Sequence, residues 1–225
     1  MSNRKTKFAN EQCYHAFNRG VDKRKIFLDQ KDYERFLLSM ILLNDEMDGL
    51  MIQWRDYSKL NPKVKPSEFL RLNLGNAGKK PLVEIIAYCL NPNHYHFILK
   101  QLVEKGIEKF MQKIGTSYTM YFNQKYKRSG SLFQGTFKSA HIDSNDYLLY
   151  LSAYVNKNNF IHGYTKNDSW PYSSWPEYLG KVNQGICNKE IILNQFKNAS
   201  EYKEFVDTNA IYLKDKKEAE KYLLE

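Results

Sequence analysis

Residues 83–99 read VEIIAYCLNPNHYHFIL, two mostly apolar runs separated by a short polar connection. The runs at 83–90 and 95–99 contain β-branched and aromatic residues, which favour strands. Asn91-Pro92-Asn93 between them favours a tight connection. The pattern predicts two adjacent antiparallel strands.

Upstream of this pair, the sequence predicts a strand and a helix. Residues 13–19 read as a strand that ends in a charged turn. Apolar residues at helical spacing then predict a helix that Asp29 or Gln30 caps and that ends near Asn44.

Downstream, helices predominate. The apolar face of residues 103–126 predicts a long helix, and a short strand is expected at 137–142. A further helix is expected from a cap at Asp143 or Ser144 to about Asn158.

The length and composition support one domain with extensions, because 225 residues with 42% apolar content can build a real core. The expected parts are a basic tail at 1–11, a domain at 12–180 with an irregular insertion at 45–80, and a helical extension at 181–225. Within the insertion we expect a short helix at 67–72, and within the extension two helices at 188–206 and 215–224.

The charge balance favours a polyanionic partner, since 34 Lys and Arg against 25 Asp and Glu give a net charge of +9. The three cysteines are widely spaced and odd in number, which fits a reducing cytoplasm better than a disulfide framework. No segment approaches the roughly 20 apolar residues of a membrane span, so we expect a soluble protein without a membrane partner.

His94 and His96 are candidate metal ligands. Residues two apart in a strand point to the same face, so both imidazoles would lie on one side and Tyr95 on the other. A single histidine is more often structural, and a His-x-His pair gains weight only from its context.

Four separated motifs supply that context. Residues 90–99, LNPNHYHFIL, closely resemble the signature of single-tyrosine (HUH) transposases of the insertion-sequence 200-like group, in which a His-hydrophobic-His motif corresponds to His94-Tyr95-His96. The resemblance covers about residues 12–180 and extends to the motifs YHAFNRG at 14–20, GSLFQGTFK at 130–138 and YVNKNN at 154–159. The motif WPYSSW at 170–175 is most similar to the branch associated with repetitive extragenic palindromes, the REP-associated tyrosine transposases.

The resemblance implies an α+β, ferredoxin-like (RRM-like) fold and a homodimer. It implies a metal-dependent transposase and endonuclease that nicks and rejoins single-stranded DNA through a 5′-phosphotyrosine intermediate, at hairpin or palindromic sites. The cofactor would be Mg²⁺ or Mn²⁺, and the location the bacterial cytoplasm at the nucleoid.

Matching the family's tyrosine segment places the nucleophile at Tyr154. Asn158 lies four residues later, one helical turn away, and could be a third ligand beside His94 and His96. The usual Asn-Pro of the family is Asn158-Asn159 here, so Asp143 and Asp146 remain alternative ligands. Tyr150 is the alternative nucleophile.

Basic, polar and aromatic residues are candidates for contact with DNA phosphates and bases, although such clusters are also common on ordinary surfaces. These candidates are Arg19, Lys127, Arg128, Phe133, Gln134 and Lys138. We assign no metal to His15, His141 or His162, and we expect Trp170 and Trp175 to pin the C-terminal segment to the domain. A non-catalytic binding module and a relaxase or replication initiator are the competing hypotheses.

Overall fold

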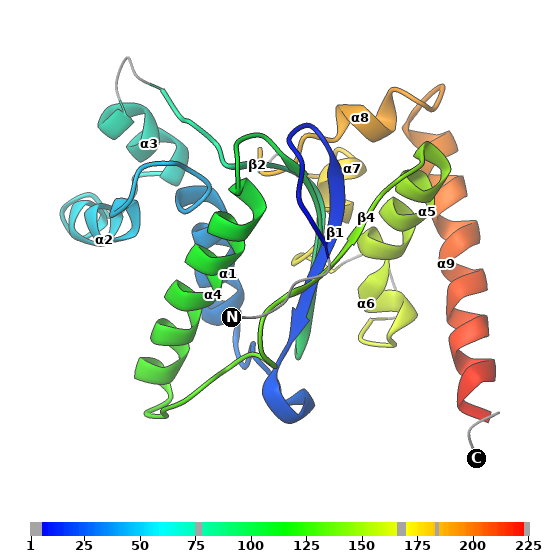
Figure 1. The fold of residues 1–225 in the computed structure, drawn as a ribbon, viewed down its shortest axis with the longest axis horizontal. Helices are drawn as coiled ribbons and strands as arrows, with labels where there is room; N and C mark the ends of the chain where they lie inside the picture. Colours follow the sequence, from blue (N-terminus) through cyan, green and yellow to red (C-terminus); the bar gives the residue numbers. More distant parts are fainter. Residues whose placement is uncertain (1–5, 75–77, 166–169, 183–184, 223–225) are drawn as a thin grey trace.

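A four-stranded antiparallel sheet runs through the centre of the protein, with helices on both of its faces (Figure 1). The computed structural model describes residues 6–74, 78–165, 170–182 and 185–222. The strands are β1 (Cys13–Arg19), β2 (Val83–Asn91), β3 (His94–Gln101) and β4 (Lys138–His141), in the spatial order β2-β3-β1-β4. This order, with α1 packed on the sheet between β1 and β2 and α4 between β3 and β4, is the βαββαβ arrangement of a ferredoxin-like fold, so the predicted fold class is confirmed.

The two helices of that arrangement cover one face of the sheet. They are α1 (Gln30–Leu42), capped by Asp29, and α4 (Gly106–Lys125). Phe36 of α1 and Phe110 of α4 are fully buried in the same cluster as Tyr95 and Phe97 of β3. This cluster is the larger core of the protein, and it packs against the face of β3 that carries Tyr95 and Phe97.

The other face packs against α5 (Asn145–Asn156), and α9 (Ala199–Tyr222) packs along α5 on the side away from the sheet (Figure 1). Two separate helices at 188–206 and 215–224 were expected, and this expectation is wrong: α9 is continuous, and only the short α8 (Glu190–Leu193) precedes it. The reason is a row of buried residues at fourfold spacing, Tyr202, Val206 and Ala210, which continues across the charged positions. The short α7 (Trp175–Tyr178) contributes Trp175, which is buried in the same cluster as Tyr202 of α9.

The insertion at 45–80 is more regular than its sequence suggested. It forms two helices, α2 (Leu50–Leu60) and α3 (Pro66–Leu74), of which only part of the second was expected. Leu50 and Phe69 are buried together with Leu42 at the end of α1, which gives the insertion a small core of its own. Long-range packing therefore stabilises helices whose own periodicity is weak.

The helix that carries Tyr154 ends earlier than expected. Lys157 has non-helical backbone angles, φ −110° and ψ 15°, and separates α5 from the short α6 (Asn158–Ile161). Its ammonium pairs with Asp207 of α9 at 2.7 Å and lies 4.6 Å from the centroid of the Trp175 ring. Asn158 thus begins a new helix instead of extending α5.

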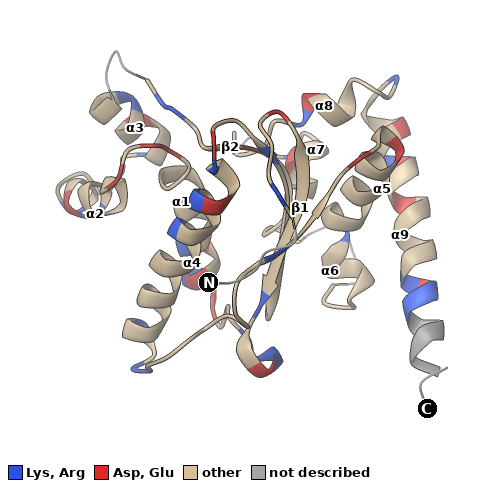
Figure 2. Cartoon of the chain, viewed as in Figure 1, with Lys and Arg blue, Asp and Glu red and all other residues tan. Residues whose placement is uncertain are grey.

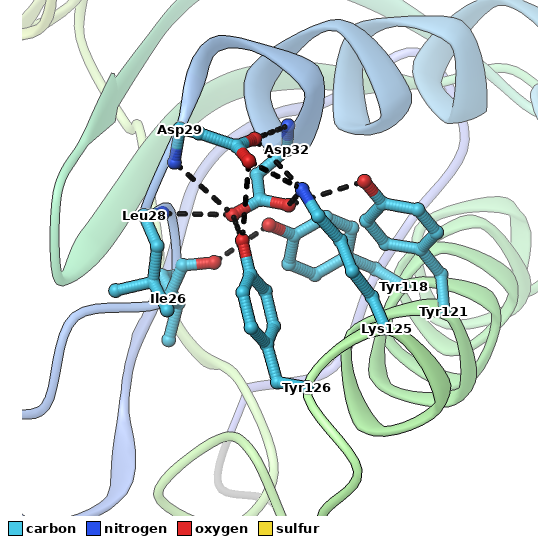
Figure 3. Close-up of polar contacts among 8 residues, drawn as sticks. All are labelled: Ile26, Leu28, Asp29, Asp32, Tyr118, Tyr121, Lys125 and Tyr126. Carbon is cyan, nitrogen blue, oxygen red and sulfur yellow. Dashed lines mark hydrogen bonds and ion pairs between the residues drawn. The ribbon is translucent and has the colours of Figure 1, made fainter.

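A buried carboxylate joins the start of α1 to the end of α4 (Figure 3). Asp32 is fully buried and accepts hydrogen bonds from the Leu28 amide and the Tyr126 hydroxyl, both at 2.8 Å, and from Lys125 Nζ at 2.7 Å. Lys125 also binds Asp29. Desolvation opposes the charged form of Lys125, but the hydrogen bonds to Asp29 and Asp32 outweigh it and raise its pKa. The end of α4 is therefore held by a closed polar network.

A search of the helices in the described ranges finds none with the length and apolar character needed to cross a membrane.

Candidate metal and tyrosine site

His94 and His96 lie on the face of β3 that is turned away from the larger core. Their ring centroids are 5.2 Å apart and their planes are perpendicular. Tyr95 between them points to the opposite face, where it is buried against Phe36 and Phe133. The alternation of the strand therefore produces the predicted pair of imidazoles, backed by a packed core.

Asn93 fixes the tautomer of His94. Asn93 Nδ2 donates to the main-chain oxygen of Lys23, in the turn η1 (Val21–Lys23), at 3.2 Å, which identifies Oδ1 as the atom that faces His94. This oxygen lies 2.6 Å from His94 Nδ1 and can only accept, so Nδ1 carries the proton. His94 Nε2 consequently presents a lone pair.

Asn158 brings a second acceptor to the same point. Its Oδ1 lies 3.1 Å from His94 Nε2 and accepts a hydrogen bond of 2.6 Å from Asn91 Nδ2. Asn91 Nδ2 also lies 3.0 Å from His94 Nε2. Two lone-pair atoms at this separation match neighbouring ligands of an octahedral cation, for which bonds of about 2.1 Å give an edge of about 3.0 Å.

His96 adds a third ligand atom. His96 Nδ1 is 2.8 Å from Nε2 of His15, which leaves its own Nε2 for a ligand. Within the described ranges, no three His, Cys, Asp or Glu side chains form a group that could hold a metal ion, so the Asn158 amide is needed to complete the set. Two imidazoles and an amide oxygen fit Mg²⁺ or Mn²⁺ with positions left for phosphate oxygens and water.

The three imidazoles of this face are neutral at pH 7. Burial lowers the pKa of His15 to about 4 and the pKa of His96 well below its ordinary value. Burial also lowers the pKa of His94 to about 4, although the hydrogen bond that a protonated His94 would donate to Asn158 acts in the opposite direction. Neutral imidazole is the form that binds metals, so no proton has to be displaced from these rings near neutral pH.

Tyr154 of α5 stands edge-on above these rings. Its centroid is 5.5 Å from that of His96 and 6.3 Å from that of His15, with planes nearly perpendicular. Burial raises the pKa of the Tyr154 phenol, and the Asn158 side chain acts against this rise. Nδ2 of Asn158 is buried and finds no hydrogen-bond partner in the part of the chain that the structure describes.

The alternative residues differ in their surroundings. Tyr150 lies one helical turn before Tyr154 on α5, and burial and the nearby Tyr212 of α9 raise the pKa of its phenol. Asp143 and Asp146 are exposed at the start of α5. Eight residues of helix separate Asp146 from Tyr154, a distance of roughly 12 Å.

A pocket of about 510 Å³ opens beside the site and contains several of the predicted DNA-binding residues. Arg19, Gln134 and Lys138 line it together with His94, His96 and Tyr154. Lys23 and Lys217 add two more cations, and none of the described lining residues is acidic. Arg19 donates from Nε to Gln134, which ties β1 to the loop before β4.

The other three predicted residues are outside this pocket. Arg128 donates to Asn123 Oδ1 at 2.8 Å and to the Ser131 main-chain oxygen at 3.0 Å. Lys127 adopts a left-handed conformation, φ 50°, just after α4. Phe133 is only 7% exposed and packs against Tyr95, so its ring is not available to a base.

Sequence reasoning missed four residues of the site. Two are His15 and His162, whose rings lie 5.1 Å from His96 and 4.8 Å from His94. The other two are Asn91, which was expected only as part of a turn, and Lys217 of α9, whose Nζ contacts His162 Nδ1 at 2.5 Å. Figure 2 shows basic residues on the C-terminal part of α9. Their pairing depends on contacts between distant segments, and only the position of His15 on a strand hinted at its role.

The fold and this site define a ferredoxin-like α+β protein with a histidine pair on its central strand and a tyrosine above it. Residues 60–158 match the family model described as transposase IS200 like, a range that includes His94, His96, Tyr154 and Asn158. Over this range, which is less than half of the chain, the sequence matches the IS200-like transposases, and the resemblance drawn from its motifs is confirmed.

One solved structure similar to this chain is a REP-associated tyrosine transposase bound to a REP hairpin. The two share 16% identity with a TM-score of 0.48, over 83% of this chain and 88% of the other. A comparison with curated proteins gives no match.

Proposed function

We propose that this transposase nicks and rejoins single-stranded DNA with Tyr154 as nucleophile and with His94, His96 and Asn158 as metal ligands. The observation that carries the proposal is the convergence of His94 Nε2 and Asn158 Oδ1, 3.1 Å apart, beside a pocket that Tyr154 also lines. The family implies nuclease activity, and a pocket whose described lining has four cations and no carboxylate suits a DNA backbone.

Each group has a distinct part in this chemistry. A divalent cation bound to the three ligands would polarise a phosphate oxygen and favour the phenolate of Tyr154. The Tyr154 oxygen forms a bond to phosphorus as the bond from phosphorus to the 3′ oxygen breaks, and the proton lost by the phenol balances the one gained by the 3′ oxygen, which leaves as a hydroxyl. Rejoining reverses this attack, so no external energy source is required.

The pocket cations would hold the strand on either side of the attacked phosphate. Arg19, Lys138 and Lys217 are placed to bind phosphates and Gln134 to bind a base or sugar, while Lys127 and Arg128 would extend this path from the end of α4. We propose hairpin or palindromic DNA as substrate and a homodimer as the working form. We further propose that residues 12–180 form the transposase domain and that 181–225 is an extension.

Covalent capture tests the proposal. Wild-type protein incubated with labelled hairpin DNA and Mn²⁺ should form a denaturation-resistant adduct, which Tyr154→Phe abolishes and the matched Tyr150→Phe retains. His94→Ala and His96→Ala should each reduce the amount of adduct at least 100-fold, since each removes a proposed ligand of the metal. An adduct with Tyr154→Phe would refute the nucleophile, and salt-sensitive binding without any adduct would identify a non-catalytic binding module.

A further inference from the structure

Asn91 occupies an unusual position between the two proposed ligands that converge. It is the last residue of β2, is fully buried, and pairs directly with His94 across the strands. Its Nδ2 lies 2.6 Å from Asn158 Oδ1 and 3.0 Å from His94 Nε2. One amide nitrogen with two protons thus meets both of these proposed metal-binding atoms.

The direction of these hydrogen bonds is settled by the surroundings. His94 Nε2 is an acceptor, because His94 Nδ1 donates to Asn93. The Asn91 atom that faces it is therefore the NH₂ group, and the Cys89 thiol lies 3.7 Å from Asn91 Oδ1, on the acceptor side. In this state both protons of Nδ2 are used, one on each ligand.

We propose that Asn91 is a positioning residue that stands in for the metal: it holds His94 Nε2 and Asn158 Oδ1 together when no cation is bound and releases His94 when one enters. The inference rests on the proposed function, in which these two atoms are metal ligands. It assigns to Asn91 the control of how tightly the site takes up its cation.

The lone pairs of the two ligands determine what must break. An imidazole nitrogen has a single lone pair, so His94 Nε2 cannot accept from Asn91 and bind a cation at once. An amide oxygen has two, so Asn158 Oδ1 can keep its hydrogen bond from Asn91 while it ligates the metal. Cation binding therefore costs one of the two hydrogen bonds.

Replacing Asn91 by a residue without a hydrogen-bond donor affects the metal-free and the metal-bound protein differently. It removes two hydrogen bonds from the metal-free protein but only one from the metal-bound protein, so the affinity for the cation rises by the value of the difference. One neutral hydrogen bond corresponds to a change of roughly 2- to 12-fold in the dissociation constant. The metal-free fold should become less stable at the same time.

The experiment measures free Mn²⁺ by electron paramagnetic resonance during titration of the full-length protein. Asn91→Leu and Asn91→Met should bind Mn²⁺ roughly 2- to 12-fold more tightly than wild type and unfold at a lower temperature without metal. The matched control is Asn44→Leu, which removes a buried asparagine whose side chain bonds to the main chain of Leu82 and Val83 at the opposite end of β2. This control should lose stability and keep its Mn²⁺ affinity.

Unchanged or weaker Mn²⁺ binding by both Asn91 variants would overturn the inference and leave the metal site itself intact. If wild type binds no Mn²⁺, or binds it equally after His94→Ala, the proposed function and the inference both fail. Should the variants not fold, amide NMR of wild type decides: Mg²⁺ should shift one side-chain proton of Asn91 away from its hydrogen-bonded position, and unchanged signals at saturating Mg²⁺ would refute the inference.

Discussion

Replacing Asp32 by asparagine tests how the end of α4 is held. The carboxylate accepts hydrogen bonds from the amides of Leu28 and Asp29, from the hydroxyls of Tyr121 and Tyr126, and from Lys125. An asparagine has the same shape as the aspartate but no charge. Its NH₂ group is a donor that would face other hydrogen-bond donors in place of an acceptor oxygen. Breaking a buried ion pair from one side costs about 3–5 kcal/mol. Because Lys125 is 24% exposed and retains Asp29, we expect the lower value, about 3 kcal/mol.

Urea unfolding followed by tryptophan fluorescence measures this cost. The midpoint should fall while the dependence on urea concentration stays the same, since the surface exposed on unfolding does not change. The matched control is Asp56→Asn, which breaks a pair with Arg55 whose side chains are 58% and 62% exposed, and it should leave the urea midpoint nearly unchanged. A loss below 1 kcal/mol for Asp32→Asn would show that this network does not stabilise the fold.

Three further predictions concern the site and its surroundings. Burial lowers the pKa of His15 from 6.5 to about 4, so the folded protein binds fewer protons than the unfolded chain, and stability that is present above pH 6.5 is lost as the pH falls toward 4. In urea titrations, wild type should therefore lose about 2 kcal/mol more than His15→Gln between pH 7 and 5. Lys217→Gln should lower the salt dependence of single-stranded DNA binding by about 0.7 in logarithmic slope, whereas its exposed neighbour Lys216→Gln should not, and equal slopes would contradict a pocket contact. Phe133→Ala should destabilise the fold by about 3–5 kcal/mol and leave the DNA affinity of the folded protein unchanged, and weaker binding by a fully folded variant would restore a stacking role.

The parts of the fold that follow from local pattern could be predicted from the sequence. The apolar runs around Asn91-Pro92-Asn93 specify β2 and β3, and the period of a strand places His94 and His96 on one face. The caps Asp29 and Ser144 were also among the expected residues, because a side-chain acceptor before an apolar periodic segment marks a helix start.

The remainder depends on contacts that no local pattern contains. His15 meets His96 only because β1 pairs with β3 in a register that sets Phe17 opposite His96, which makes His15 its diagonal neighbour. The break at Lys157 requires Asp207, fifty residues further on, as its partner. Lys217 reaches the pocket because α9 packs along α5 as one continuous helix.

The face of the sheet that holds the site is divided between core and chemistry. Ile86 and Ile98 are fully buried beneath α5, while His96 and His94 lie two and four residues before Ile98 on the same face of β3. The same helix α5 therefore serves both regions: Leu151 and Val155 anchor it to the apolar half, and Tyr154 faces the polar half. Rigid packing on one side fixes the height of the tyrosine above the imidazoles, as a preorganised site requires. A substitution that loosens the apolar half should consequently displace Tyr154 without touching any proposed ligand.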